Sequence, residues 1–311
     1  MRGIVKFLVG LFMVVLMVGF GIGYVLYGEV NKYISNFIAT NPRSEAASDR
    51  TWSAYQQYER KNLQIQSKEG YFLSGTLLFS NIPTADTVIF VHGFSQHRDS
   101  GLPYSKMYLD NGYNVLLADY GSDGKRADGK PVSVTWGVRE AEDVESWVKT
   151  LKEQYPEGEV GLHGVSLGAA TALIHSGNYG TGKFYVADSA YSDFNEFLMD
   201  KAENIAVWGV PLRPYLPVLV PFLNTIVYAH DGIWFYAASP ERGLKKTSKP
   251  VLLLHGKEDT LIPVNMASRL QQAGNNSSEL IIFEGAKHAE ERFVSPREYR
   301  RKVMEFVLKQ Q

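Results

Sequence analysis

The strongest chemical signal in the sequence is Gly164-Val165-Ser166-Leu167-Gly168. This motif directly follows the apolar run Val160–Leu162 and His163, and it opens an alanine-rich helical pattern. A sharp turn from strand to helix exposes a serine hydroxyl at the carboxyl end of the strand, and its crowded backbone requires glycine on both sides. The motif therefore predicts Ser166 as a nucleophile, with the N–H of Leu167 at the start of a helix.

A serine hydroxyl attacks well only when a base takes its proton and an acid orients that base. Asp259 follows the apolar run Val251–Leu254, and His288 follows the run Leu280–Phe283. The loops after parallel strands emerge at one edge of a sheet, where ligands bind. We expect Ser166, His288 and Asp259 to be nucleophile, base and acid of one site, rather than a solvated loop histidine and a helix-capping aspartate.

An acyl-transfer site also needs N–H donors for the negative charge that develops on the substrate oxygen. The apolar run Thr87–Val91 leads into His92-Gly93-Phe94. We expect the backbone N–H groups of Phe94 and Leu167 to be these donors. Asp188 ends another apolar run and is an alternative acid, but Asp259 fits the chain order of nucleophile, acid and base better.

Short apolar runs alternate with amphipathic segments through most of the chain. Runs rich in Val, Ile and Leu without alternation are typical of strands that are buried on both faces. Two leading strands, near 63–66 and 71–79, precede these runs, and apolar residues recur at helical spacing within Glu140–Leu151. The pattern predicts an α/β fold with a mostly parallel, doubly wound sheet. The expected buried strands are Thr87–Val91, Val115–Ala118, Val160–Leu162, Phe184–Ala187, Val251–Leu254 and Leu280–Phe283.

The uncharged run Phe7–Tyr27 predicts one membrane-spanning helix, because a helix of that length is about 31 Å long and matches the hydrocarbon core. The run is longer than the apolar stretch of a signal peptide and ends in a poor cleavage site. We expect a single-pass cell-membrane anchor over 1–35 and a linker or polar helix over 36–61. Arg2 and Lys6 favour an extracytoplasmic main domain. Secretion after cleavage of a signal peptide is the alternative.

The segment Ile205–Tyr236 interrupts the alternation, and only Arg213 and Asp231 within it are charged. Its prolines argue against one long helix and against a second membrane span. We expect short pieces that form an apolar cap, at about 190–240, over a substrate pocket. A dip into the bilayer interface beside the anchor is the rival interpretation. The residues expected to line the pocket are Trp208, Leu216, Leu219, Phe222, Ile226 and Trp234.

The motifs together resemble those of the α/β-hydrolase superfamily over residues 62–311. With its anchor, the chain is similar to membrane-anchored bacterial members of the serine aminopeptidase-like or monoacylglycerol lipase-like branch. The resemblance implies Ser166 as nucleophile, Asp259 as acid, His288 as base and a cap between strands six and seven. One loop departs, because many relatives have Arg-Gly-His-Gly-x-Ser where this chain has Tyr120-Gly121-Ser122-Asp123-Gly124. The matched motifs are His92-Gly93-Phe94, Gly164-Val165-Ser166-Leu167-Gly168, His255-Gly256-x-x-Asp259 and His288.

Composition excludes several classes of protein. The chain has 32 Lys and Arg against 33 Asp and Glu, so it lacks the basic excess of a nucleic-acid-binding protein. It has no cysteine, which removes thiolate metal sites, and its His and Asp spacings match neither a zinc motif nor a calcium loop. We therefore expect no cofactor, no metal and no nucleic acid partner.

The sequence predicts a membrane-tethered serine hydrolase that cleaves a small-molecule ester or a lipid-like substrate through an acyl-enzyme. The apolar cap favours esters with a hydrophobic acyl part. A peptidase or amidase uses the same triad and is the alternative. A non-enzymatic shell that binds an apolar ligand is a further alternative, but it has no need for a complete triad.

Overall fold

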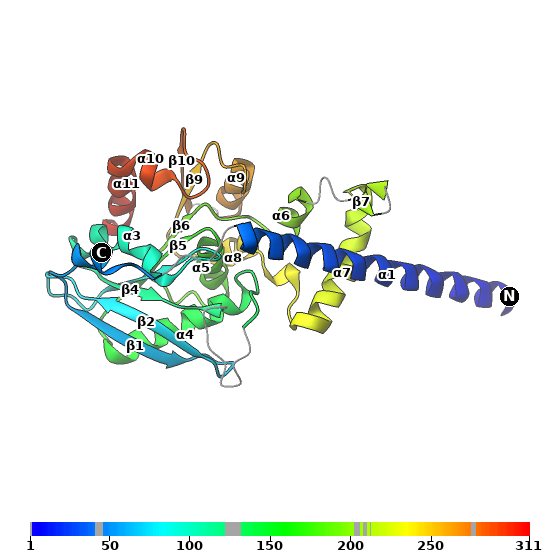
Figure 1. The fold of residues 1–311 in the computed structure, drawn as a ribbon, viewed down its shortest axis with the longest axis horizontal. Coiled ribbons are helices and arrows are strands. Elements are labelled where there is room, and N and C mark those ends of the chain that lie inside the picture. Colours follow the sequence, from blue (N-terminus) through cyan, green and yellow to red (C-terminus); the bar gives the residue numbers. More distant parts are fainter. Residues whose placement is uncertain are drawn as a thin grey trace. The chain divides into compact units, whose positions relative to one another are not determined.

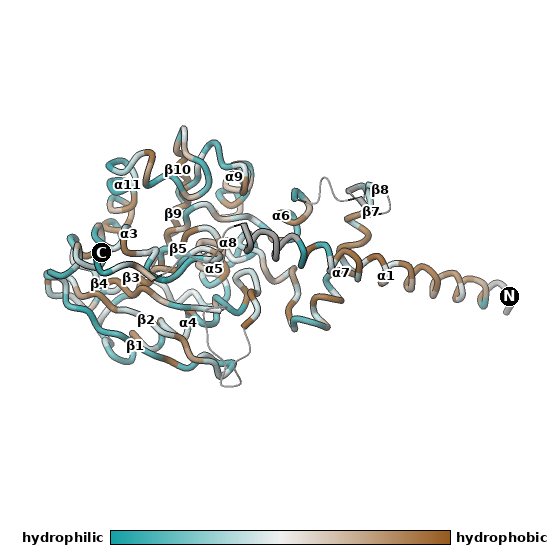
Figure 2. The backbone as a smooth tube through the Cα atoms, in the orientation of Figure 1, coloured by the Kyte–Doolittle hydropathy of each residue, from teal (hydrophilic) through white to brown (hydrophobic). Residues whose placement is uncertain are grey.

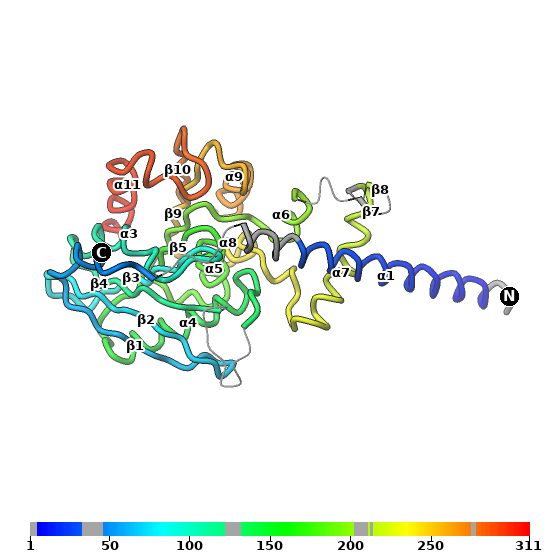
Figure 3. Tube along the Cα trace, viewed as in Figure 1, coloured from blue at the N-terminus to red at the C-terminus, as the bar shows by residue number. Residues whose placement is uncertain are grey.

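The computed structural model describes residues 2–40, 46–121, 132–201, 206–207, 210–211, 213–274 and 278–311 (Figure 1), and Figure 3 traces the chain from its N-terminus to its C-terminus. The chain divides into two compact units. The smaller unit contains Met1–Pro42 and Phe194–Ala237, and the larger unit contains Arg43–Asp193 and Ala238–Gln311.

The larger unit is built on one eight-stranded sheet with the order β1-β2-β4-β3-β5-β6-β9-β10 (Figure 1). The β1–β2 and β2–β4 pairs are antiparallel, and all other neighbouring pairs are parallel. The predicted mostly parallel sheet is confirmed. Its strands are β1 (Arg60–Gln66), β2 (Phe72–Leu78), β3 (Thr87–Val91), β4 (Asn114–Ala118), β5 (Val160–Val165), β6 (Tyr185–Asp188), β9 (Val251–Gly256) and β10 (Ser278–Phe283).

Apolar side chains form a core on each face of this sheet. One core joins the sheet to α4, α5, α8 and α9, and the other joins it to α3 and α11. In α4 the predicted apolar stripe, which includes Trp147 and Leu151, is buried. The elements outside the sheet are α2 (Asp49–Ser53), η1 (Arg98–Gly101), α3 (Leu102–Leu109), α4 (Val138–Gln154), α5 (Leu167–Asn178), α8 (Pro240–Lys246), α9 (Val264–Ala273), α10 (Glu291–Val294) and α11 (Pro296–Leu308).

The smaller unit contains the long helix α1 (Arg2–Thr40), which is apolar over most of its length (Figure 2). Its segment Val5–Lys32 is long and apolar enough to cross a membrane. The helix continues past residue 35, where we expected the linker to begin. The other elements of this unit are α6 (Phe194–Lys201), β7 (Ala206–Val207), β8 (Val210–Pro211), η4 (Arg213–Tyr215), α7 (Leu216–Asp231) and η5 (Phe235–Ala237).

The described part of the predicted cap segment forms several elements rather than one long helix, as expected, but one of them, α7, continues unbroken from residue 216 to 231 and contains two of the prolines. Pro217 lies in the first turn, where an N–H group has no helical acceptor. Pro221 lies inside the helix and removes one hydrogen bond from it. The helix packs on α1 along one face, and this burial compensates for the lost bond.

Candidate active site

The turn between β5 and α5 positions Ser166 in a strained conformation, with φ 56° and ψ −117°. A Cβ on Gly164 would lie 2.1 Å from the carbonyl oxygen of Gly168, and a Cβ on Gly168 would lie 1.9 Å from that of Val91. Both positions therefore require glycine, as the sequence predicts. The N–H of Ser166 donates to the carbonyl of Asp188 at 2.8 Å, which holds the turn against β6.

The structure brings the three predicted catalytic residues together at the carboxyl edge of the sheet. The Nε2 atom of His288 lies 2.8 Å from the Oγ atom of Ser166. The Nδ1 atom of His288 lies 2.8 Å from Oδ2 of Asp259. With its proton on Nδ1, the imidazole donates to the carboxylate and its Nε2 accepts the serine hydroxyl. This geometry allows a proton to pass from the hydroxyl to the ring.

The side chain of Asp259 is buried, and both of its oxygens take part in hydrogen bonds. Its Oδ1 accepts the backbone N–H groups of Leu261 at 2.9 Å and Ile262 at 2.8 Å. Burial by itself raises the pKa of Asp259, but the hydrogen bond and charge of His288 and the Ile262 N–H outweigh burial and leave that pKa below its ordinary value. The carboxylate is therefore ionised when it faces the imidazole. His255 is a buried histidine, and its Nε2 lies 2.8 Å from the Ile262 carbonyl.

A second acidic group supports the loop that carries His288. The N–H of Ala289 donates to the Oγ of Ser189 at 3.1 Å, and that hydroxyl donates to Oε1 of Glu291 at 2.8 Å. Asp188 lies beside them and accepts the hydroxyl of Tyr299 at 2.7 Å. Burial, reinforced by the charge of Glu291, raises the pKa of Asp188 well above its ordinary value. Asp188 therefore belongs to the hydrogen-bond network that holds the loop of His288. The acid that pairs with His288 is Asp259.

The loop after β3 passes beside the nucleophile. A Cβ on Gly93 would lie 3.5 Å from Cβ of Ser166 and 3.4 Å from the Val165 carbonyl. Phe94 is the next residue in this loop, and Leu167 is the first residue of α5, where a backbone N–H has no acceptor within the helix. Both stay predicted oxyanion donors.

Sequence reasoning missed an aromatic pair next to this loop. The ring of Trp136 stacks on that of Phe94, with the ring centres 5.4 Å apart. Trp136 has a positive φ of 54°, and the hydroxyl of Tyr191 donates to its carbonyl at 2.7 Å. In the sequence, Gly137 precedes an amphipathic helix and indicates a turn, but it does not predict the contact between the rings of Trp136 and Phe94.

The six predicted pocket residues of the cap have different placements. Trp208 lies outside the described residues. Leu216 and Leu219 are buried. Phe222 and Ile226 face the glycines of α1, and Trp234 is exposed and stacks on Tyr228 with ring centres 4.6 Å apart. A pocket lined by these side chains stays a prediction.

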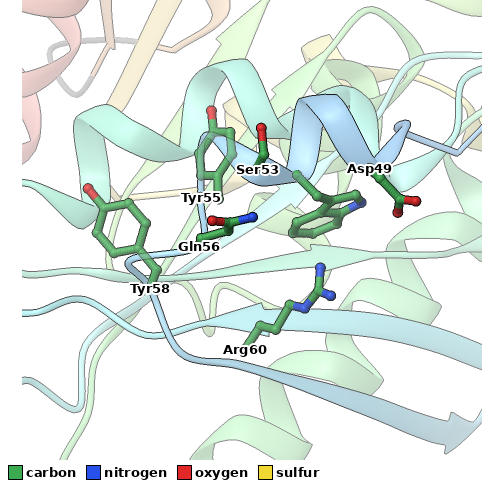
Figure 4. Close-up of a pocket in the computed structure, with 7 residues that line it drawn as sticks. Asp49, Ser53, Tyr55, Gln56, Tyr58 and Arg60 are labelled. Carbon is green, nitrogen blue, oxygen red and sulfur yellow. The ribbon is translucent and has the colours of Figure 1, made fainter.

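A separate open cavity of about 400 Å³ lies beside α2, and none of its lining residues belongs to the Ser166 site (Figure 4). The guanidinium of Arg60 lies 4.8 Å from the centre of the Trp52 ring. The hydroxyl of Tyr58 donates to Asp110 at 2.7 Å, and the hydroxyl of Tyr55 donates to the Leu102 carbonyl. These contacts fasten the segment before β1 onto α3. The cavity is lined by Asp49, Trp52, Ser53, Tyr55, Gln56, Tyr58 and Arg60.

Comparisons with known proteins agree with this fold. A family model described as the prolyl oligopeptidase family matches residues 103–310, a range that contains Ser166, Asp259 and His288. The protein YqkD of Bacillus subtilis (strain 168) is 32 % identical over 259 residues, which cover 82 % of this chain and 82 % of YqkD. The Pyrococcus furiosus esterase Pf2001 is 26 % identical with a TM-score of 0.64, over 86 % of this chain and 96 % of the esterase. The Pyrococcus horikoshii acylaminoacyl peptidase shares the fold, with 15 % identity and a TM-score of 0.58 over 83 % of this chain and 42 % of the peptidase.

Proposed function

The chain belongs to the prolyl oligopeptidase family of α/β-hydrolases, and from that premise we propose that it is a membrane-tethered carboxylic ester hydrolase. The observation that carries the proposal is the pair of 2.8 Å contacts that link Ser166 to His288 and His288 to Asp259. A nucleophile, a base and an orienting acid within hydrogen-bond distance are the parts that acyl transfer requires.

The proposed reaction proceeds in two halves. The Oγ of Ser166 attacks the ester carbonyl carbon while His288 takes the hydroxyl proton on Nε2. The N–H groups of Phe94 and Leu167 hold the oxyanion, and Asp259 stabilises the imidazolium. Collapse breaks the bond to the alcohol, which leaves with the proton from His288. Water then attacks the acyl-serine and gives a proton to Nε2 of His288. The second tetrahedral intermediate collapses, the bond from the acyl carbon to Oγ of Ser166 breaks, and His288 returns its proton to that oxygen as the carboxylic acid departs.

Two observations support an ester with an apolar acyl group. The likeness to Pf2001 is to a protein described as an esterase. The ring of Trp136 stacks on that of Phe94, in the loop whose Gly93 lies against Ser166, and we expect this aromatic pair to form an apolar wall of the acyl site. Each methylene buried on such a wall contributes about 0.8 kcal/mol, roughly a fourfold gain in kcat/KM per carbon until the pocket is full.

The family name favours a second candidate, a peptidase or amidase that uses the same three residues. A substrate panel separates the two activities. The full-length chain in detergent is assayed with p-nitrophenyl esters of increasing acyl length and with aminoacyl anilides. We expect a higher kcat/KM for the esters, with a rise along the series that Trp136→Ala flattens. A higher kcat/KM for the anilides would replace the esterase with a peptidase, and turnover of neither would contradict both.

We also propose that α1 anchors the enzyme in the cell membrane with the larger unit outside the cytoplasm. The apolar segment Val5–Lys32 supports the anchor, and Arg2 and Lys6 before its most apolar part support the orientation. The full chain is expected to remain in the pellet after carbonate extraction of membranes. Release into the supernatant would show that α1 does not span the bilayer.

A further inference from the structure

Helix α7 crosses α1 in the smaller unit, and their contacts advance together along both helices (Figure 1). Gly19 lies under the ring of Phe222, and Gly23 lies against Phe222 and Ile226. One turn further, the rings of Tyr27 and His230 stack with their centres 5.0 Å apart. The Tyr27 hydroxyl also donates to Asp231 at 3.3 Å. The contact therefore extends over the C-terminal half of the uncharged run of α1.

The glycines of α1 allow this close approach. A Cβ on Gly19 would lie 2.4 Å from the Phe222 ring, and a Cβ on Gly23 would lie 3.0 Å from Cβ of Phe222 and 3.2 Å from its backbone. Small residues four apart permit such helix packing within membranes. Leu26 and Val30 are buried and continue the same stripe of α1 at helical spacing. Gly21, on the other side of α1, has open space where its Cβ would lie.

The outer face of α7 is exposed but carries no charge. Val218 is 68 % exposed, and Pro221, Thr225 and Tyr228 are also exposed at helical spacing. Met17 lies on the opposite face of α1, one turn before Gly21, and is 65 % exposed, so both helices present apolar side chains to their surroundings. Such exposed apolar side chains are unfavourable in water but are suited to lipid, because the two helices satisfy their own backbone groups except at Pro221.

Polar and aromatic groups gather where this surface ends. Glu29 and Lys32 follow the uncharged run of α1, and Asp231 ends α7. Tyr24, Tyr228 and Trp234 are exposed in the same part of the smaller unit. Tyrosine and tryptophan at the border between apolar and charged residues are typical of the membrane–water interface.

We propose that α7 is embedded in the bilayer leaflet beside the C-terminal half of α1, so that the outer face of α7 contacts lipid. This inference rests on the proposed membrane anchor and extends it, because it assigns the bilayer as the partner of a segment that follows β6 in the hydrolase chain. An enzyme held on lipid by both helices meets lipid-like esters at the membrane rather than in water.

Single cysteines test the proposal cleanly, because the native chain has none. Met17→Cys, Val218→Cys and Lys61→Cys are each labelled with an environment-sensitive NBD fluorophore in the full chain and reconstituted into phosphatidylcholine vesicles containing spin-labelled lipid. Lys61 is an exposed residue of β1 in the larger unit and serves as the water-facing control. We expect blue-shifted emission and strong quenching at positions 17 and 218, with quenching at 218 at least half that at 17, and little quenching at 61.

The outcomes separate this inference from the anchor on which it rests. Quenching at 17 without quenching at 218 would overturn the placement of α7 in the bilayer and would leave the anchor intact. The outer face of α7 would then contact water or a second copy of the chain. Absence of quenching at 17 would overturn both. In a second set, Gly23→Leu should reduce quenching at 218 at least twofold because it separates the helices, whereas Gly21→Leu, the matched change on the open side of α1, should leave it unchanged.

Discussion

At the scale of single residues, the proposed catalysis depends on the orientation that Asp259 gives to the imidazole of His288. Replacing Asp259 with Asn keeps the size of the side chain but leaves the imidazole in the wrong tautomer. We expect Asp259→Asn to lower kcat by about 10⁴-fold with an unchanged melting temperature to within a few degrees. Steady-state kinetics and circular dichroism of the purified variant measure both quantities. A loss of less than tenfold would mean that another acid orients His288.

The buried carboxyl of Asp188 makes a separate prediction about pH. Because its pKa is raised in the folded protein, the folded chain keeps a proton that the unfolded chain releases above about pH 4. The free energy of unfolding therefore falls as pH rises above that value. We expect Asp188→Asn, which keeps the size of the side chain and has no titrating proton, to flatten this dependence between pH 5 and 8.

Urea unfolding at pH 5, 6.5 and 8 measures the dependence on pH. Asp49→Asn, at an exposed position at the start of α2, is the control and should follow the parent chain. The groups that face Asp188 are Glu291, Ser189 and Tyr299, and none of them changes in either variant. Parallel curves for Asp188→Asn and the parent would contradict a retained proton.

At the scale of elements, the β5–α5 turn requires Gly168, because a Cβ there would meet the backbone carbonyl of Val91 at 1.9 Å. The carbonyl of Val91 cannot move without a shift of strand β3. We therefore expect Gly168→Ala to lower the free energy of unfolding by about 2–4 kcal/mol. Gly93→Ala is the control, because its Cβ would make only ordinary contacts, and it should cost less than about 1 kcal/mol. Equal losses in chemical unfolding would show that the turn is more adaptable than its geometry indicates.

The α1–α7 contact predicts that α1 stays in the mature protein. Leu26 and Val30 are buried, and Phe222 rests on a glycine of α1, so removal of this helix would uncover the apolar face of α7. We expect the intact mass of the protein purified from native membranes to include residues 1–35. A mass that begins after α1 would indicate a cleaved signal peptide and a different partner for α7.

At the scale of the whole molecule, the sequence was most informative where local patterns suffice. Uninterrupted Val, Ile and Leu runs located the strands, and the loops after three of them contained Ser166, Asp259 and His288. It was least informative where tertiary contact decides the outcome. The positions of the prolines alone predicted breaks in α7. The helix nevertheless continues past Pro221, because its packing on α1 compensates for the hydrogen bond lost there. The contacts of Glu291 and Trp136 near the site could not be predicted. Each depends on a residue far away in the sequence, Ser189 for Glu291 and Phe94 for Trp136, that only the fold brings close.

An active-site probe tests whether Ser166 is the nucleophile. The full-length chain is treated with a fluorophosphonate in detergent and analysed by intact mass and peptide mapping. We predict one covalent adduct per chain on Ser166, loss of that adduct in Ser166→Ala, and slowing of labelling by at least a hundredfold in His288→Ala. An adduct on a different serine, or labelling of Ser166→Ala at the parental rate, would contradict the account.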